Sequence, residues 1–484
     1  MNEKWPKSLV VVGNGMAGSR LVSELRARDR EMRITVFGAE AAQPYNRVLL
    51  SNVLAGITAP GDIGLTDPGW YAANDVDARL GAEVVAIDRE HRTVTSADGR
   101  ATPYDTLVLA TGSAPVVPPL PGLDAEGVVA FRTLDDCRSI MDLADGAESA
   151  VVVGGGLLGL EAARGLAGRG LRVTVIHLAG HLMERQLDAE AGGVLQRTIG
   201  DLGVRTLVGA RLTGARAENG RVTGVELDDG TVLPADLVVL ACGIRPQTGL
   251  ARAAGLTVDR GVVVDDRLRS VDDPDVHAIG ECAQHQGTVY GLVAPAWEQA
   301  RILADLLTGG DSRYEGSRQV TRLKAAGIEL AAMGETALGD DEAEVVRFAD
   351  PTRGTYKKVV IRDDRLIGAI LIGETTTAGL LTQLYDRAAP VPSDRLGLLF
   401  HGLSPATPAE TPVRIPDAAT VCACNNVSKG RIRACWEAGA RDVADVAAET
   451  RATTGCGGCR DTVEGILEWL GTQEVTSPPR SGRT

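Results

Sequence analysis

The chain has 484 residues, 44% of them apolar and 24% charged, a composition typical of a folded protein with a large core. This length exceeds what one core ordinarily organises, so roughly three domains are expected. A formal charge of −14 argues against a nucleic-acid partner, and no apolar run is long enough to span a bilayer. With no signal-peptide pattern at its start, the chain is expected in the cytoplasm, away from nucleic acid and membrane.

The first expected element is a buried strand over 9–12, which ends in Gly13-x-Gly15-x-x-Gly18 and leads into a helix over 19–28. In such a pattern the first glycine permits a sharp turn, the second lets a pyrophosphate approach the backbone, and the third lets helix and strand pack closely. The unpaired N–H groups at the start of the helix then hold the phosphates. We therefore assign a dinucleotide site to Gly13, Gly15, Met16, Ala17 and Gly18.

A second strand is expected over 32–37, and Glu40 follows it about where a dinucleotide fold places the acid that binds ribose hydroxyls. The next segment, Tyr45-Asn-Arg-Val-Leu-Leu-Ser51, is too polar at its start for a core strand. It resembles the Tyr-x-Arg-x-x-Leu-Ser segment that lines the flavin in flavoprotein reductases with two dinucleotide-binding domains. The resemblance implies a flavin-site role for Arg47, whereas the residues alone leave open a solvated loop arginine.

Two further segments are assigned to the same flavin site. A hairpin over 81–99 carries Val84, and a buried strand after Tyr104 ends in Ala-Thr111-Gly112. The Ala-Thr-Gly ending resembles a signal that these reductases place near the flavin, where the chain leaves the first domain. Four prolines between 115 and 121 indicate a stiff connection to the next domain.

The opening pattern then repeats, with a strand over 150–153, Gly154-x-Gly156-x-x-Gly159 and a helix over 160–168. Two such patterns in one chain are hard to explain as chance turns, so the second is expected to bind NAD(P)H. We assign to this site Gly154, Gly156, Leu157, Leu158, Gly159 and Glu161.

The strand over 171–176 ends at His177, where an NAD site usually has an acid for the adenosine ribose. His177 either packs against the adenosine or caps the strand. Because neither that acid nor an evident arginine for a 2′-phosphate is present, the preference between NADH and NADPH stays open.

Two motifs mark the return to the first domain. The first, Gly243-Ile-Arg-Pro-Gln247, resembles the Gly-x-Arg-Pro-Asn element of the same reductases, with Gln in place of Asn. The second, Ala278-Ile-Gly280-Glu281, resembles their Ala-x-Gly-Asp flavin motif. The resemblance implies that these glycines lie at the cofactors and that the Glu281 carboxylate accepts a ribityl hydroxyl.

The last part of the chain carries Cys422-x-Cys424 and, after 31 intervening residues, Cys456-x-x-Cys459. Four thiolates in two close pairs are what a [2Fe–2S] cluster requires, and flanking glycines let backbone N–H groups point at the sulfurs. A structural zinc site is the alternative, although the cysteine pairs of such sites usually have a wider spacing than Cys422-x-Cys424. The stretch resembles the bacterioferritin-associated-ferredoxin type of [2Fe–2S] domain. Buried thiols are expected for Cys137, Cys242, Cys282 and Cys435, which have no partner at ligand spacing.

Together these elements predict an α/β protein with two Rossmann-like dinucleotide-binding domains, similar to glutathione reductase, a small α+β domain and a small helical [2Fe–2S] domain. Six prolines between 390 and 416 indicate a mobile linker before the cysteines. The expected divisions are an FAD-binding domain at 1–119 and 246–310, an NAD(P)-binding domain at 120–245, an α+β domain at 318–387, a linker at 388–418, a [2Fe–2S] domain at 419–470 and a disordered tail at 471–484.

Over nearly its whole length, the chain resembles the amino-terminal half of NAD(P)H nitrite reductase large subunits and the FAD- and NAD(P)H-dependent electron-transfer subunits of assimilatory nitrate reductases. The resemblance implies that a hydride from NAD(P)H reaches FAD and that electrons then leave singly through the cluster, with no acid, base or nucleophile dominating catalysis. The implied partner is a nitrate reductase catalytic subunit. Nitrite reduction by this chain is not expected, because its sequence shows no sirohaem domain.

Other interpretations stay open. The chain could reduce a ferredoxin, a rubredoxin or a separate sirohaem nitrite reductase, or it could be a redox-sensing iron–sulfur protein. A disulfide reductase is not expected, because no cysteine lies between Met1 and Asp136. The oligomeric state is likewise open.

Overall fold

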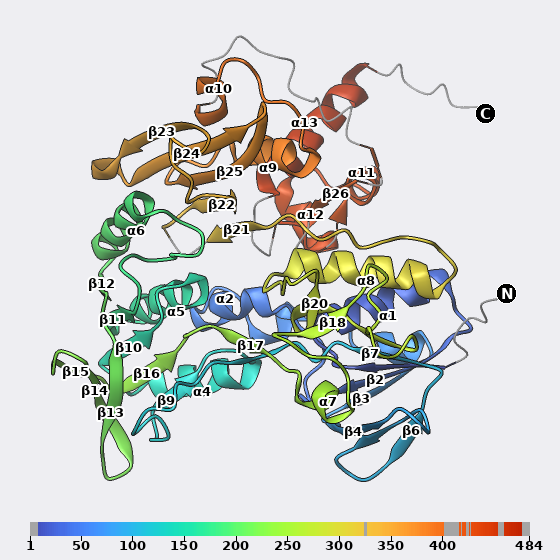
Figure 1. Cartoon of the computed structure of the whole chain (residues 1–484). Coiled ribbons are helices and arrows are strands. Elements are labelled where there is room, and N and C mark those ends of the chain that lie inside the picture. The colour runs from blue at the N-terminus through green and yellow to red at the C-terminus, as the bar shows by residue number, and fades with distance from the viewer. Residues whose placement is uncertain are drawn as a thin grey trace. The chain divides into compact units, whose positions relative to one another are not determined.

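The computed structural model describes residues 8–323, 327–400, 416–417, 419–422, 425, 427–453 and 459–476. Contacts divide the chain into two compact units, Met1–Ile176 with Ala210–Gln319 and His177–Gly209 with Val320–Thr484. Both units mix helices and strands, so the predicted α/β class is confirmed (Figure 1). Among the described helices, none is long and apolar enough to cross a membrane.

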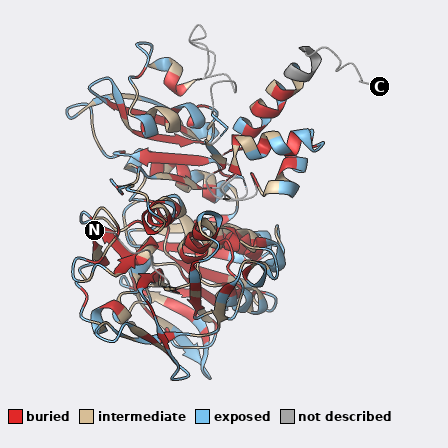
Figure 2. Cartoon of the chain, turned by 90° about the vertical axis from the view of Figure 1, so that its right-hand side faces the viewer, coloured by how far each residue is buried: buried red, intermediate tan, exposed pale blue. Residues whose placement is uncertain are grey.

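A parallel sheet with β1 at its centre organises the first half of unit 1. Its strand order is β19 (Val276–Ala278), β7 (Thr106–Leu109), β1 (Ser8–Val12), β2 (Arg33–Gly38) and β3 (Val76–Leu80). The helices α1 (Met16–Arg28) and α8 (Val293–Leu307) contact one another along their lengths (Figure 1). Residues 9–12 are all buried, which explains why β1 is apolar throughout instead of alternating. Figure 2 shows buried residues along many of the strands and helices of the chain.

Short elements surround this sheet. They are η1 (Arg47–Leu49), α2 (Leu50–Leu54), η2 (Pro60–Ile63), α3 (Trp70–Ala73) and the antiparallel strands β4 (Val84–Asp88), β5 (Thr93–Ser96) and β6 (Ala101–Pro103).

A second parallel sheet in the same unit repeats the arrangement. Its neighbouring strands are β11 (Arg172–His177), β10 (Ser149–Val153), β16 (Leu237–Leu240) and β9 (Val128–Ala130). The helix α5 (Leu157–Gly168) follows β10 and packs on it, and α2 packs against α5. The helix α4 (Leu134–Ala144) and the antiparallel strands β13 (Leu212–Glu218), β14 (Arg221–Leu227) and β15 (Val232–Pro234) complete this half.

The two chain segments that connect the sheets run side by side. The strand β8 (Ser113–Pro115) leaves the first sheet and pairs antiparallel with β17 (Ile244–Pro246), which returns to it. The second sheet is therefore an insertion in the chain of the first. The return segment continues through α7 (Gly249–Ala253), β18 (Val262–Val264), η3 (Gly280–Cys282) and β20 (Ala283–His285).

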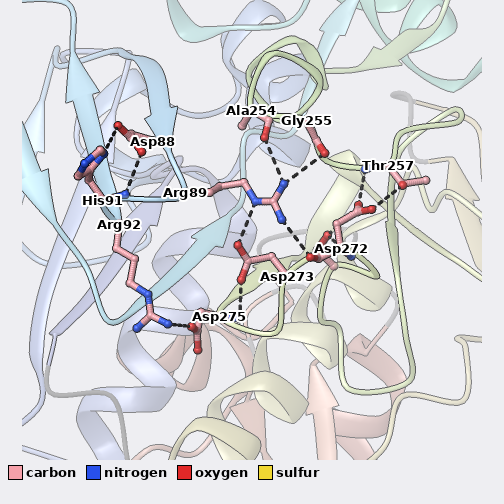
Figure 3. A network of polar contacts seen from close by, with 11 residues as sticks. Asp88, Arg89, His91, Arg92, Ala254, Gly255, Thr257, Asp272, Asp273 and Asp275 are labelled. Atoms are coloured by element: carbon pink, nitrogen blue, oxygen red, sulfur yellow. Dashed lines mark hydrogen bonds and ion pairs between the residues drawn. The ribbon is translucent and has the colours of Figure 1, made fainter.

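Arg89, the residue after β4, ties the β4 hairpin to this return segment (Figure 3). Its guanidinium donates to the Asp273 carboxylate at 3.0 Å and to the Asp272 carbonyl at 2.9 Å. Two weaker bonds reach the carbonyls of Ala254 and Gly255 at 3.4 and 3.3 Å. The partners lie at least 165 positions away along the chain, so one side chain joins segments that are distant in the sequence.

Unit 2 contains an antiparallel sheet, and two of its inner strands, β24 and β25, contact helix α6 (Ala189–Asp201). The strand order is β21 (Val320–Leu323), β22 (Leu330–Gly334), β25 (Arg365–Ile372), β24 (Thr355–Arg362) and β23 (Glu344–Asp350), with η4 (Pro351–Arg353) between β23 and β24. Asp188, which caps α6, accepts hydrogen bonds from the Tyr356 hydroxyl at 2.9 Å and the Lys358 ammonium at 3.0 Å. This carboxylate anchors α6, which is followed by β12 (Val204–Val208), to the sheet.

Part of the expected linker is folded onto this sheet. After α9 (Ala378–Arg387), the short helix α10 (Leu396–Leu399) buries Leu398 and Leu399 in the core of the α+β domain. The fully buried Lys357 donates to the Leu399 carbonyl at 2.6 Å. Residues 388–400 therefore extend the α+β domain, because their apolar run supplies core side chains despite the prolines. Residues 401–415 and 418 lie outside the described residues.

The cysteine-rich segment forms a small helical module. It contains β26 (Thr420–Cys422), β27 (Val427–Ser428), α11 (Lys429–Glu437), α12 (Val443–Thr450) and α13 (Arg460–Thr476), whose buried side chains share one core. The last helix continues past residue 470, where a disordered tail was expected to begin. No proline interrupts the helical sequence before Pro478, and residues 477–484 lie outside the described part of the chain.

The Arg89 network predicts a specific loss of stability. Replacing Arg89 with Ala leaves the Asp273 carboxylate, whose side chain is 18% exposed, without its guanidinium partner. We expect unfolding to become easier by about 1–3 kcal/mol, measured as a lower urea midpoint for unit 1. The control is Arg100→Ala, because Arg100 is 81% exposed and pairs only at 3.4 Å with Asp98. Equal midpoints for the two variants would contradict this assignment.

Candidate functional site

The first glycine of each fingerprint occupies a turn that no other residue fits. Gly13 has φ +114° and Gly154 has φ +119°, both in the left-handed region. A Cβ at Gly13 would overlap the Ala110 carbonyl oxygen, and a Cβ at Gly154 would overlap the Ala241 carbonyl oxygen. Both turns therefore press against the strand that neighbours the fingerprint strand.

The third glycine of each fingerprint holds the helix against this turn. A Cβ at Gly18 would overlap the Gly13 carbonyl oxygen, and a Cβ at Gly159 would overlap that of Gly154. Both glycines lie in the first helical turn, because α1 begins at Met16 and α5 at Leu157. The sequence placed both helix starts three residues later, so the first turns, including Ala17 and Leu158, are helical rather than part of the loop.

The second glycines, in contrast, face open space. No heavy atom beyond the neighbouring residues lies within 4 Å of a Cβ built at Gly15 or at Gly156. The helix N-termini just after them offer free N–H groups and the positive end of the helix dipole. Each fingerprint thus has room and hydrogen-bond donors where a pyrophosphate is expected.

Asn14 provides an independent test of whether a dinucleotide fits the first fingerprint. Its side-chain oxygen accepts a hydrogen bond from the Tyr71 hydroxyl at 2.5 Å. Its side-chain nitrogen is buried and finds no hydrogen-bond partner among the described residues. An unsatisfied buried donor is costly, and a phosphate or ribose oxygen bound beside this turn would satisfy it. The residues present therefore fit a bound dinucleotide.

Glu40 and Arg47, both assigned to the flavin site, form an ion pair. Glu40 also accepts a hydrogen bond from the Tyr45 hydroxyl at 2.7 Å, and Arg47 donates to the Arg132 carbonyl at 3.1 Å. The Arg47 side chain is 22% exposed and lies over the Tyr45 ring. Arg47 is therefore held in a defined position, which argues against the freely solvated loop arginine.

Glu281 is also held by an arginine. Its carboxylate pairs with the Arg132 guanidinium and accepts a hydrogen bond from the Ser113 hydroxyl at 2.7 Å. The sequence analysis did not single out Arg132 or Ser113, because each lies at least 149 positions from Glu281. The only local signal is that Arg132 precedes Thr133, whose side chain forms the capping box of α4.

The exit and return segments of the inserted domain meet at two other assigned residues. The Thr111 hydroxyl donates to the Gln247 carbonyl at 2.8 Å, and the Gln247 N–H donates to the Gly112 carbonyl at 2.9 Å. Gly112 and Gly243 adopt positive φ values of +68° and +102°. Gln247, which stands where the related motif has Asn, thus makes its bonds through the backbone.

The remaining assigned residues of the first sheet are tightly packed. The N–H of Gly280 donates to the Gln299 side chain at 2.7 Å, and a Cβ at Gly280 would lie 2.9 Å from that of Ala17. The Met16 carbonyl accepts a hydrogen bond from the Trp297 indole at 3.1 Å. Val84 is 7% exposed within the hydrophobic core, so the side chain faces the core.

Glu161 lies on α5, beyond the second fingerprint, and is partly buried. It is hydrogen-bonded to Ser51 of α2. Burial raises the pKa of the Glu161 carboxyl to about 7, and the hydrogen bond from Ser51 offsets part of this increase. The sequence pattern places Glu161 on the helix but gives no sign of Ser51 as its partner.

His177, the other residue considered for nucleotide binding, lies at the end of β11 and is 9% exposed. Its Nε2 is 2.9 Å from a carboxylate oxygen of Glu184. The last residue of this strand therefore pairs with a carboxylate. The sequence analysis did not identify Glu184 as the partner of His177.

Two of the four cysteines that the sequence predicts as cluster ligands lie among the described residues. Cys422, at the end of β26, and Cys459, just before α13, are both buried in one core. Cys424 and Cys456 lie outside the described residues. Two buried cysteines in one small core fit the [2Fe–2S] cluster that the sequence predicts.

The other four cysteines follow the expectation of enclosed thiols. Cys137, Cys282 and Cys435 are buried and Cys242 is partly buried. Burial raises the pKa of Cys137 to about 11. These thiols are therefore protonated at neutral pH and unsuited to redox exchange.

Three family models match the chain. Residues 7–300 match pyridine nucleotide-disulphide oxidoreductase, residues 320–387 match the rubredoxin NAD+ reductase C-terminal domain, and residues 420–469 match the BFD-like [2Fe-2S] binding domain.

Similar proteins include nitrite reductase [NAD(P)H] of Bacillus subtilis (strain 168), which is 42% identical over 96% of this chain and 57% of its own length. The assimilatory nitrate reductase electron transfer subunit of the same organism is 37% identical over 97% of this chain and 60% of its own. The chain therefore spans less than two thirds of either relative. Among solved structures, the covalent putidaredoxin reductase–putidaredoxin complex matches 81% of this chain and 95% of its own, with TM-score 0.75 and 29% identity.

The second fingerprint supplies a matched pair of variants. Gly156→Ala places a methyl group in open space, so we expect an unchanged thermal midpoint but a KM for NADH raised about 10-fold, because the pyrophosphate loses its close approach. Gly159→Ala forces a methyl group onto the Gly154 carbonyl and should cost about 1–3 kcal/mol of stability. An unchanged KM in Gly156→Ala would show that the nucleotide binds elsewhere.

Proposed function

Because the chain belongs to the pyridine nucleotide-disulphide oxidoreductase family, we propose that it oxidises NAD(P)H in the cytoplasm and delivers the electrons to a separate redox protein, the catalytic subunit of an assimilatory nitrate reductase. The predicted cofactors FAD, NAD(P)H and [2Fe–2S] are confirmed by the family matches. The observation that carries the proposal is the pair of equivalent glycine fingerprints in one unit, combined with a separate cysteine module.

Bound FAD supplies the chemistry that joins these parts, since it accepts a hydride as an electron pair and can release electrons singly to an iron–sulfur cluster. The chain's own residues bind and orient the cofactors. The turns at Gly15 and Gly156 offer N–H donors to the pyrophosphates, and Arg132 orients the Glu281 carboxylate for a ribityl hydroxyl. Arg47, fixed by Glu40, supplies positive charge at the flavin side of the site.

The cysteine module determines how the electrons leave. Cys422 and Cys459, with Cys424 and Cys456, supply the four thiolates of the cluster. The family name includes disulphide reduction, but the sequence has no cysteine between Met1 and Asp136. A disulfide relay beside the flavin is therefore not available, and the electrons have to leave through the cluster.

The named relatives support a separate protein acceptor. One is an electron transfer subunit of an assimilatory nitrate reductase, and one solved structure holds a reductase bound to its redox partner. A second candidate acceptor is a rubredoxin or ferredoxin, which the match to a rubredoxin reductase C-terminal domain favours. Reduction of a separate sirohaem nitrite reductase is a further alternative, whereas a redox sensor would leave the nicotinamide site without a role.

A pair of cysteine variants separates hydride transfer from one-electron delivery. Cys459→Ala removes a cluster ligand, so we expect loss of the cluster's visible absorbance and acid-labile sulfide, loss of electron transfer to the acceptor protein, and retained NADH-dependent ferricyanide reduction. Cys435→Ala changes a buried thiol of the same core and should keep all of these. Stoichiometric zinc without sulfide in the parent protein would instead support the zinc alternative.

Reconstitution tests the acceptor. Mixing the full chain, NADH or NADPH, nitrate and a purified nitrate reductase catalytic subunit should produce nitrite, and omission of this chain should abolish it. Rapid reduction of rubredoxin, ferredoxin or a sirohaem protein without nitrite formation from nitrate would transfer the assignment to that acceptor.

A further inference from the structure

Asn14 is the one residue of the first fingerprint, residues 13–18, whose side chain carries a hydrogen-bond donor. It stands between Gly13, whose positive φ makes the turn, and Gly15, which faces open space. The Asn14 side chain lies against the end of β2, because a Cβ built at Gly38 would be 3.1 Å from the Asn14 Cβ. The glycine at this strand end therefore leaves the room that the amide occupies, directly beside the turn where the first dinucleotide is expected.

The Tyr71 hydroxyl holds the oxygen end of this amide. Tyr71 lies on α3, 57 positions along the chain from Asn14, and its hydroxyl donates to the Asn14 Oδ1 at 2.5 Å. The Tyr71 ring is 6% exposed in the hydrophobic core of unit 1 and meets the Trp70 ring edge-on at 5.4 Å. Because burial raises the pKa of Tyr71 to about 12, its hydroxyl keeps its proton at neutral pH and remains a donor.

The nitrogen end of the same amide is unsatisfied. The Asn14 Nδ2 is buried, and no acceptor reaches it within the part of the chain that the structure describes. A flipped amide would pair Nδ2 with the Tyr71 oxygen, but it would then present Oδ1, which cannot donate, to a bound phosphate. By donating to Oδ1, the Tyr71 hydroxyl selects the orientation that a ligand with acceptor oxygens requires.

We propose that Tyr71 is a positioning residue for FAD, which turns the Asn14 amide so that Nδ2 donates to a pyrophosphate oxygen. This inference rests on FAD occupying the first fingerprint, as the proposed function requires. It extends the site from the fingerprint to α3, an element that the sequence analysis did not connect with the cofactor.

A pyrophosphate suits this donor because all its free oxygens are acceptors. Their negative charge also strengthens a hydrogen bond from an N–H group. Helix α1 begins at Met16, two residues after Asn14, so the amide adds a side-chain donor to the backbone donors at this helix N-terminus. The amide and the helix start thus act on the same part of the ligand.

The test measures the Kd for FAD of the full chain freed of its flavin, followed by quenching of flavin fluorescence. Asn14→Asp keeps an acceptor for the Tyr71 hydroxyl but replaces the donor with a negatively charged oxygen. We therefore expect the Kd for FAD to rise about 10²-fold, because a carboxylate repels the pyrophosphate. The thermal midpoint of the flavin-free protein should stay at the parent value, since the bond to Tyr71 is kept.

Tyr71→Phe tests the positioning role directly. It keeps the buried ring but frees the amide, which binding then has to orient, so the Kd for FAD should rise about 5-fold. The matched control is Tyr104→Phe. Tyr104 is 4% exposed in the same core, and its hydroxyl has no hydrogen-bond partner among the described residues, so this variant should bind FAD as the parent does.

The outcomes separate this inference from the function beneath it. If the flavin-free parent binds no FAD, the proposed function itself is wrong. If the parent binds FAD and either Asn14→Asp or Tyr71→Phe keeps its Kd, the inference is overturned. A lower thermal midpoint with an unchanged Kd would show that the bond between Tyr71 and Asn14 only stabilises the fold. An equal rise of the Kd in Tyr104→Phe would likewise overturn the assignment.

Discussion

The two dinucleotide-binding turns depend on four glycines, because the lack of a side chain at these positions lets each helix lie close to its turn. At Gly13 with Gly18, and again at Gly154 with Gly159, the backbone of a helix lies against the carbonyl of a turn so closely that a single methyl group would overlap it. This contact aims the N-terminus of each helix at open space above Gly15 and Gly156. The phosphate-binding geometry is therefore a consequence of steric packing, and helix dipoles and N–H groups act only because this packing has placed them.

The acidic residues of the predicted site differ in the group that interacts with each carboxylate. Glu40 and Glu281 each have an arginine partner, which keeps a carboxylate charged and points its oxygens in a fixed direction. Glu161 has a hydroxyl partner, which favours the charged form less than a cation would. One unit thus holds two carboxylates fixed by arginines and one carboxyl held by a hydroxyl.

The site residues that the sequence predicts are those whose expected role is set by their immediate neighbours. The fingerprint glycines, Glu40 and Glu281 are recognisable because a strand, a turn and a helix lie next to them in the chain. The partners that hold the acids were not recognisable. Arg132, Ser113 and Ser51 have ordinary local surroundings, and they meet their acids only because the inserted domain returns to the first sheet.

The sequence by itself determined the duplicated architecture, the cysteine spacing and the order of the modules, since each depends on short-range patterns of apolar, glycine and thiol residues. Only the tertiary structure decided that residues 388–400 belong to the α+β core, that Arg89 ties the β4 hairpin to a segment at least 165 positions away, and that Glu161 faces a serine. The physical reason is that burial and hydrogen bonding depend on which distant segments meet, and a linear pattern does not record those meetings.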